Sequence, residues 1–151
     1  HYFLTKKIQV QAFYQNQFNS ALKINNRSLV GLNATRRFKT NQAIYNLTAG
    51  AFYEDEFYSD QTEQTLFRGN LTTSISTELS NLDIHLTLYF QPDLLNLQDY
   101  RMLQELSLQF PVSDQLKFEI ESALRYDSEP HLNLLALDFS TVMGIVYSIS
   151  N

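Results

Sequence analysis

Polar and apolar residues alternate along most of the chain, and the alternation is clearest over residues 100–126. Two arms of this segment carry apolar side chains at every second position and polar or charged side chains between them. The apolar positions are Tyr100, Met102, Leu106, Leu108 and Phe110 in the first arm, and Leu116, Phe118, Ile120, Leu124 and Tyr126 in the second. This period of two predicts a pair of strands with one apolar and one polar face. The residues between them, 112–115, have the composition of a tight turn.

The same period predicts eight full strands, at residues 8–18, 28–38, 43–54, 66–79, 84–90, 100–110 and 116–126 and in a last segment that ends near residue 149. No helical segment separates them, so an antiparallel up-and-down sheet is expected. Residues 1–3 are expected to end a further strand. Short links (4–7, 39–42, 80–83, 112–115) alternate with longer links (19–27, 55–65, 92–99, 128–133). All short turns then lie at one end of the sheet, as in bacterial outer-membrane barrels.

Aromatic residues on the apolar face fall at two heights. Near the short turns lie Phe38, Tyr45, Phe110, Phe118 and Tyr147; near the long links lie Phe18, Tyr53, Phe67, Phe90, Tyr100 and Tyr126. Two aromatic girdles around an aliphatic band are typical of a barrel that crosses a membrane. We therefore expect an all-β, antiparallel transmembrane β-barrel, with the apolar face toward lipid and the polar face inside.

The composition fits this interpretation. A chain of 151 residues is one domain, residues 1–151. It has no cysteine, which excludes disulfides and thiolate metal sites, and its net charge of −5 argues against a nucleic-acid partner. No apolar run is long enough for a membrane helix. A β-barrel does not need one, because its apolar band occupies every second residue.

Several segments resemble a family of salt-induced outer-membrane proteins of unknown function, in the form found in Bacteroidetes-type bacteria. They are NRSLVGLNATRRF (26–38), LFRGNLTTSISTEL (66–79), residues 88–130 and LDFSTVMGIVY (137–147), with F-Q-P at 90–92 and R-Y-D-S-x-P at 125–130 as the most telling motifs. The resemblance implies a barrel in the bacterial outer membrane of a Gram-negative cell, and it carries no established activity or site residue. It also implies further strands before residue 1, in a barrel of about twelve. A complete eight-stranded barrel is the alternative.

Charged and polar residues of the inner face form a candidate interior network. Its members are Arg68, Glu78, His85, Arg101, Glu105, Lys117, Glu119, Glu121, Arg125 and Asp138, accompanied by Arg37, Glu54 and Asp127. These side chains either select a solute in a pore or pair with one another and fill the interior. We favour pairing, because buried charges must be compensated.

The remaining candidates favour a protein without a catalytic or metal site. His85 is the only histidine on a predicted strand, and it points inward near the short-turn end, whereas the sites of barrel lipid hydrolases face lipid near the outer rim. A site of three histidines is implausible, since His1 is terminal and His131 lies in a link. Arg36 and Gln104 break the outward apolar pattern. Arg36 can snorkel to a boundary, and Gln104 would suit either a contact with a partner protein or a local bulge. The acidic link at 55–65 is expected to be solvated rather than a cation or partner site.

The sequence therefore predicts an outer-membrane protein of structural or envelope-associated role, or a subunit of an outer-membrane complex. We expect no enzymatic activity and no cofactor. Outer-membrane lipid and other outer-membrane proteins are the expected partners. The alternatives are a small-solute pore, a lipid-modifying barrel enzyme and a soluble lipocalin-like carrier with its apolar face inward.

Overall fold

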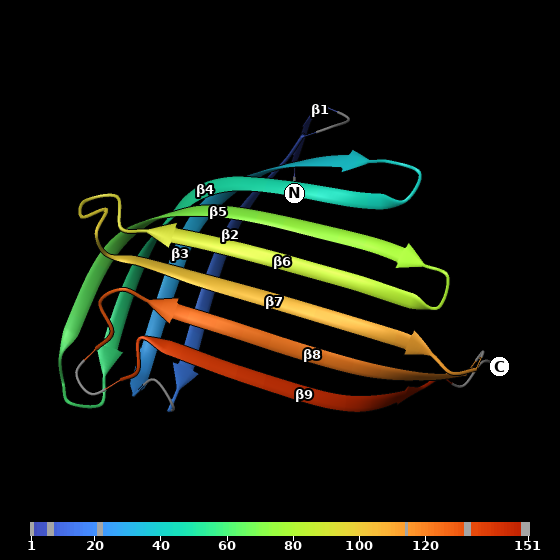
Figure 1. Ribbon diagram of the computed structural model, residues 1–151. Helices are drawn as coiled ribbons and strands as arrows, with labels where there is room; N and C mark the ends of the chain where they lie inside the picture. The colour runs from blue at the N-terminus through green and yellow to red at the C-terminus, as the bar shows by residue number, and fades with distance from the viewer. Residues whose placement is uncertain (1, 6–7, 21–22, 114, 132–133, 149–151) are drawn as a thin grey trace.

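The computed structural model describes residues 2–5, 8–20, 23–113, 115–131 and 134–148. In these residues the chain forms a single antiparallel sheet in which every strand pairs with the next along the chain (Figure 1). The strands are β1 (Tyr2–Thr5), β2 (Ile8–Asn19), β3 (Ile24–Lys39), β4 (Ala43–Tyr58), β5 (Glu63–Leu79), β6 (Leu82–Pro92), β7 (Tyr100–Pro111), β8 (Leu116–Asp127) and β9 (Leu137–Tyr147). The described part of the chain has no helix that could cross a membrane.

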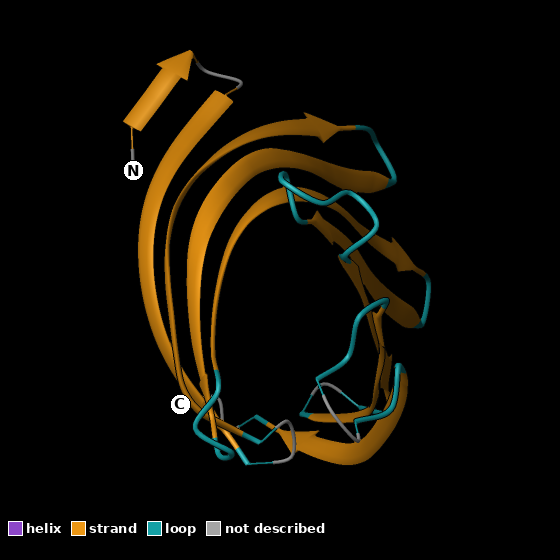
Figure 2. Cartoon of the chain, turned by 90° about the vertical axis from the view of Figure 1, so that its left-hand side faces the viewer, coloured by secondary structure: helices purple, strands orange, loops and turns teal. Residues whose placement is uncertain are grey.

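The sheet is strongly curled and wraps around a central space (Figure 2). It is open, because within the described residues β1 and β9, the two ends of the strand order, do not pair with each other. The short β1 pairs only with the start of β2, and its position eight strands away gives it the same direction as β9. The two outer strands therefore cannot continue the antiparallel ladder with each other. The prediction of an all-β, antiparallel up-and-down sheet is confirmed, whereas closure into a barrel is not.

The predicted link at 55–65 is wrong in most of its length, because the hairpin of β4 and β5 continues to Tyr58 and Glu63. Asp55 pairs with Thr65 across this hairpin, and the Thr65 hydroxyl donates a 2.7 Å hydrogen bond to Asp55 Oδ1. The link at 19–27 is also shorter than predicted, since β3 begins at Ile24. The strict alternation of short and long links is therefore wrong. Most residues of the predicted links 19–27 and 55–65 belong to strands instead, and only 93–99 and 128–136 remain as longer links.

The two faces of the curled sheet differ sharply in chemistry. Apolar side chains lie on the convex face and are open to the surroundings, among them Tyr14 (71% exposed), Leu32 (61%) and Leu71 (52%). Charged side chains lie on the concave face, where Glu54 is fully buried and Arg68 is 1% exposed. This arrangement does not fit a soluble carrier with an apolar interior.

Aromatic side chains of the convex face are neighbours across the strands at two levels. At the end of the sheet that carries the turns at 40–42, 80–81 and 112–115, Phe38 pairs with Tyr45. At the same end the rings of Phe110 and Phe118 lie 6.3 Å apart. The Arg36 guanidinium lies 4.8 Å from the centre of the Phe38 ring. At the other end, Tyr53 pairs with Phe67, and the Tyr100 ring lies 5.7 Å from that of Phe90 and 5.8 Å from that of Tyr126. Most of the predicted girdle residues therefore have an aromatic neighbour at their own level, and we call these two levels the aromatic belts; Tyr147 pairs with Leu116 instead.

Candidate functional site

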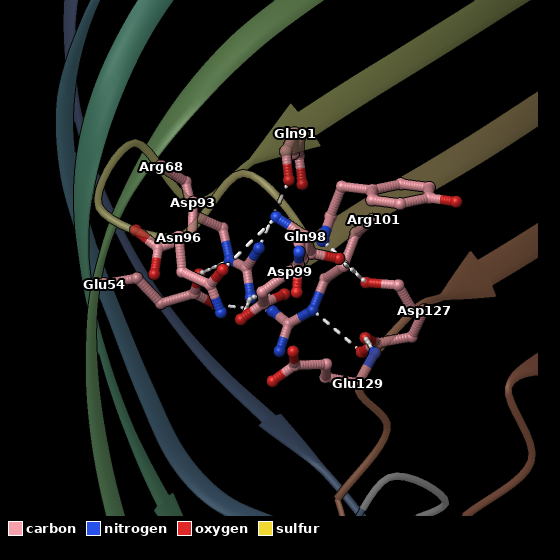
Figure 3. Close-up of polar contacts among 12 residues, drawn as sticks. Glu54, Arg68, Gln91, Asp93, Asn96, Gln98, Asp99, Arg101, Asp127 and Glu129 are labelled. Carbon is pink, nitrogen blue, oxygen red and sulfur yellow. Dashed lines mark hydrogen bonds and ion pairs between the residues drawn. The ribbon is translucent and has the colours of Figure 1, made fainter.

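The concave face encloses a cavity of about 600 Å³, lined by side chains from β2 to β9. At the end that carries the links 93–99 and 128–136, arginine and carboxylate side chains extend into this space from several strands. We call this set the ionic cluster; its members are Arg27, Glu54, Glu56, Arg68, Asp99, Arg101 and Asp127. Figure 3 shows most of them in close-up.

Two buried carboxylates of β4 form the centre of the ionic cluster. Glu54 accepts hydrogen bonds from Arg68 Nε (3.1 Å) and from Arg101 Nη1 (2.9 Å), and it also pairs with Arg27. Glu56 is bound by Arg101 Nη2 at 3.1 Å, and its other oxygen lies 3.3 Å from Arg27 Nε. These positions alternate along β4, so both carboxylates point to the concave side.

The arginines connect the centre of the cluster to the opposite wall. Arg101 on β7 donates to Asp127 on β8 at 2.9 Å (Figure 3). Its other nitrogens hold Glu54 and Glu56. Arg68 on β5 donates to both oxygens of Asp99, at 3.0 and 3.2 Å. Three guanidinium groups thus compensate four carboxylates that would otherwise be costly to bury. The cluster occupies part of the concave space at this end and joins β4 to β7 and β8.

The link 93–99 is folded so that it presents Asp99 to Arg68. The Leu94 N–H donates to the Phe67 carbonyl (2.8 Å), which fixes the start of the link to β5. The Asp93 N–H donates to the Asp99 carbonyl (2.8 Å), and the Asp99 N–H donates to the Asn96 carbonyl (2.9 Å). These three bonds leave the Asp99 carboxylate directed into the interior.

The link 128–136 packs against the turn between β4 and β5. The His131 ring stacks on Tyr58 with the ring centres 3.8 Å apart, and its Nε2 lies 2.9 Å from Asp60 Oδ2. The Tyr58 hydroxyl donates to Glu56 Oε2 at 2.6 Å. Tyr58 therefore connects the stacked His131 ring to Glu56 of the ionic cluster.

Asp60 gives a test of this contact by pH. The Thr62 hydroxyl, the His131 ring and the Thr62 backbone N–H lower the pKa of the Asp60 carboxyl from 3.8 to about 2. A lowered pKa means that the contact stabilises the protein fully above pH 3.8 and loses this effect as the pH falls through 2. We expect Thr62→Val to raise the pKa of Asp60, measured by NMR of the carboxyl carbon. Thr65→Val, which removes a hydroxyl from Asp55 instead, should leave it unchanged; titration of Asp60 near 3.8 in the unaltered protein would contradict the structure.

The predicted interior residues divide into several groups. Arg68 and Arg101 belong to the ionic cluster. Lys117 lies 3.4 Å from Asp83, Glu119 accepts a 2.6 Å bond from Gln109, and Tyr89 donates to Glu105 at 3.3 Å. Glu78 and His85 line a second cavity of about 630 Å³ at the turn end. Glu121, Arg125, Asp138 and Arg37 have no ion-pair partner among the described residues.

Sequence reasoning missed three members of the ionic cluster, since it placed Arg27, Glu56 and Asp99 in links. For Glu56 a signal was present: the alternation of Glu54 continues through Glu56 to Tyr58, all of them buried. Nothing local marks Arg27 or Asp99, because their partners lie on strands distant in sequence.

The other sequence candidates have simple placements. His85 accepts or donates at both ring nitrogens, with Ser76 Oγ at 2.7 Å and Thr87 Oγ1 at 3.2 Å. Gln104 lies on the convex face between Leu88 and Leu124 on the flanking strands. The described residues contain no group of three histidine, cysteine or acidic side chains arranged to hold a metal ion.

Comparison with family models gives one match. Residues 1–149 match the model described as "Protein of unknown function, DUF481". The chain belongs to the DUF481 family. No curated protein and no solved structure is significantly similar to it. Membership in DUF481 thus covers almost the whole chain, and the ionic cluster lies entirely within the matched residues.

Proposed function

We propose that this DUF481 chain is an outer-membrane protein of structural or envelope-associated role, whose convex face contacts lipid and whose interior is bridged by the ionic cluster. One observation carries the proposal: large apolar side chains cover the convex face while charged side chains are buried on the concave face. In water this distribution would expose a wide apolar surface, which soluble monomers avoid. In a bilayer the apolar convex face would meet lipid, and the charged concave face would point to the polar interior.

The dimensions of the sheet support the same conclusion. A strand tilted across a bilayer needs about 9–11 residues, and β2 to β9 have between 11 and 17 residues each. The two aromatic belts lie where tyrosine and phenylalanine would meet the two lipid–water interfaces. Lipid offers no partner to backbone groups, so the proposal includes pairing of the free edges of the sheet. β2 runs opposite to β9 and could complete an antiparallel ladder with it, whereas β1 could not.

The ionic cluster favours a structural protein or a subunit of a larger outer-membrane complex over a small-solute pore. It bridges β4 to β7 and β8 with side chains that are buried or nearly so, and these side chains obstruct part of the space at that end. We assign no catalytic step, because both His85 nitrogens are engaged by neighbouring hydroxyl groups. The resemblance to salt-induced outer-membrane proteins of Gram-negative bacteria agrees with this assignment.

The location of the convex face can be tested with single cysteines, because the chain has none of its own. Leu32→Cys, Leu71→Cys and Leu88→Cys place a thiol on the middle of the convex face, and Asn41→Cys places one in the turn between β3 and β4. We expect a water-soluble maleimide to label Asn41→Cys rapidly in protein reconstituted into vesicles and the three convex variants slowly. All four should react equally after unfolding in urea. Rapid labelling of the convex sites in vesicles would refute the membrane location.

A further inference from the structure

A row of amide side chains crosses the concave face of four strands. Gln11 on β2 pairs with Asn33 on β3. Asn33 in turn pairs with Gly50 on β4, and Gly50 pairs with Asn70 on β5. The three amides line the cavity of about 600 Å³. This row therefore presents three amide side chains to the cavity, and at Gly50 it presents backbone without a side chain.

Gly50 allows this row to form. Asn70 Nδ2 donates to Asn33 Oδ1 at 3.0 Å, and the Thr72 hydroxyl donates to Asn70 Oδ1 at 3.1 Å. A Cβ atom at residue 50 would overlap Asn33 Oδ1 and the Leu32 carbonyl oxygen. The two asparagines thus lean toward each other over the glycine and are held in fixed orientations.

An aromatic ring lies beside the row. Phe13 on β2 pairs with Gly31 on β3, and a Cβ atom there would come within 2.8 Å of Phe13 Cζ and 2.5 Å of Phe52 Cβ. The missing side chain lets the Phe13 ring approach β3, with its centre 6.3 Å from that of Phe52. Gln11 and Gln15 flank Phe13 on the same face of β2. An apolar ring is therefore set between uncharged polar groups.

The amides of β2 are available to a ligand. Within the described residues, the side chains of Gln11, Gln15 and Gln17 make no hydrogen bond, although all three line the cavity. Each amide offers both donors and an acceptor. The buried Nε of Arg27, at the edge of the same cavity, also has no hydrogen-bond acceptor. The opposite wall differs, since it carries the charged side chains of Arg101, Glu105, Arg125, Asp127 and Asp138, of which Arg101 and Asp127 pair with each other.

This combination suits a neutral, hydroxyl-rich molecule. Hydroxyl groups donate and accept, as the amides do, and the C–H face of a sugar ring can pack on an aromatic ring. An anion is disfavoured, because four carboxylates and three guanidinium groups line the cavity, namely Glu56, Glu105, Asp127, Asp138, Arg27, Arg101 and Arg125. The cavity volume is in the range of small-molecule sites.

We propose that the amide wall, formed by Gln11, Phe13, Gln15, Asn33 and Asn70, binds a neutral saccharide of one or two rings. The site depends on the concave face alone, so saccharide binding and membrane location are tested separately.

The experiment is calorimetric titration of the full chain with maltose, cellobiose and chitobiose. The detergent must carry no sugar headgroup, and an alkyl amine oxide meets this condition. We expect at least one disaccharide to bind with a Kd of about 1 mM or tighter. The double variant Gln11→Ala/Gln15→Ala should weaken binding about tenfold or more, and Phe13→Leu should weaken it as well.

Gln104→Ala is the matched control, because it removes an amide from the convex face. It should bind the disaccharide as the unaltered chain does, and all variants should show the same circular dichroism. Absence of binding by all three disaccharides at about 10 mM would overturn the proposal. Equal loss in Gln104→Ala, or tighter binding of glucuronate than of the neutral sugars, would overturn it too.

Discussion

Replacing Arg101 with methionine is expected to lower the free energy of unfolding by about 3–5 kcal/mol. Arg101 holds Glu54, Glu56 and Asp127 at the same time, and both glutamates are buried. Without the guanidinium group, their charges lose their largest shared partner while they remain out of water. Urea unfolding in detergent or vesicles, followed by circular dichroism, measures the change. Arg101→Lys should recover only part of it, since an ammonium group cannot span three carboxylates.

The control for Arg101 is Lys117→Met. Lys117 and Asp83 form a single ion pair with side chains that are 42% and 40% exposed, so its loss should change stability by about 0–1 kcal/mol. Adding Glu54→Gln to Arg101→Met should restore part of the lost stability by removing one uncompensated charge. Similar effects of Arg101→Met and Lys117→Met would show that the ionic cluster contributes no more than a surface pair.

Replacing Leu71 with arginine is expected to destabilise the protein in a bilayer by about 2–4 kcal/mol. Leu71 lies on the convex face of β5, midway along the strand between Phe67 of one aromatic belt and Ile75, which pairs with Tyr45 of the other belt. A charge at this height would sit near the bilayer midplane. The change is measured as the shift of the urea midpoint in vesicles of defined thickness.

Leu79→Arg provides the comparison at the end of the same strand. Leu79 is also on the convex face, with the same exposed fraction of 52%, but it lies at the turn end of β5. Its replacement should cost only about 0–1 kcal/mol, because arginine is tolerated near the interface. Equal costs at residues 71 and 79 would mean that no hydrocarbon layer surrounds the convex face.

The period of two was sufficient to predict the strands and the chemistry of their faces. It places Leu71 on one side and Arg68 on the other without any knowledge of tertiary structure, because strand geometry alone fixes the alternation. It could not predict the hairpin of β4 and β5 near residue 60. Acidic composition there indicated a loop, and the arginine that makes Glu56 tolerable inside is 45 residues away.

The amide wall and the openness of the sheet were also beyond sequence reasoning. Phe13 interrupts the polar alternation of β2, and its position over Gly31 follows only from the pairing of β2 with β3. Glycine at 31 and at 50 looks like a weak strand residue in sequence, yet each gives the space that a neighbouring side chain occupies. The direction of β1 relative to β9 follows only from the full pairing order.

The ionic cluster also sets an order of events during assembly. Glu54 is separated from Arg101 by 47 residues along the chain, so β3 to β5 can form hairpins well before β7 reaches them. Until then the carboxylates of β4 are only partly neutralised and favour contact with water over burial. Glu54 and Glu56 therefore gain their full set of partners only after β7 has docked. Arrival of Arg101 then links the hairpins of β4 to the second half of the sheet.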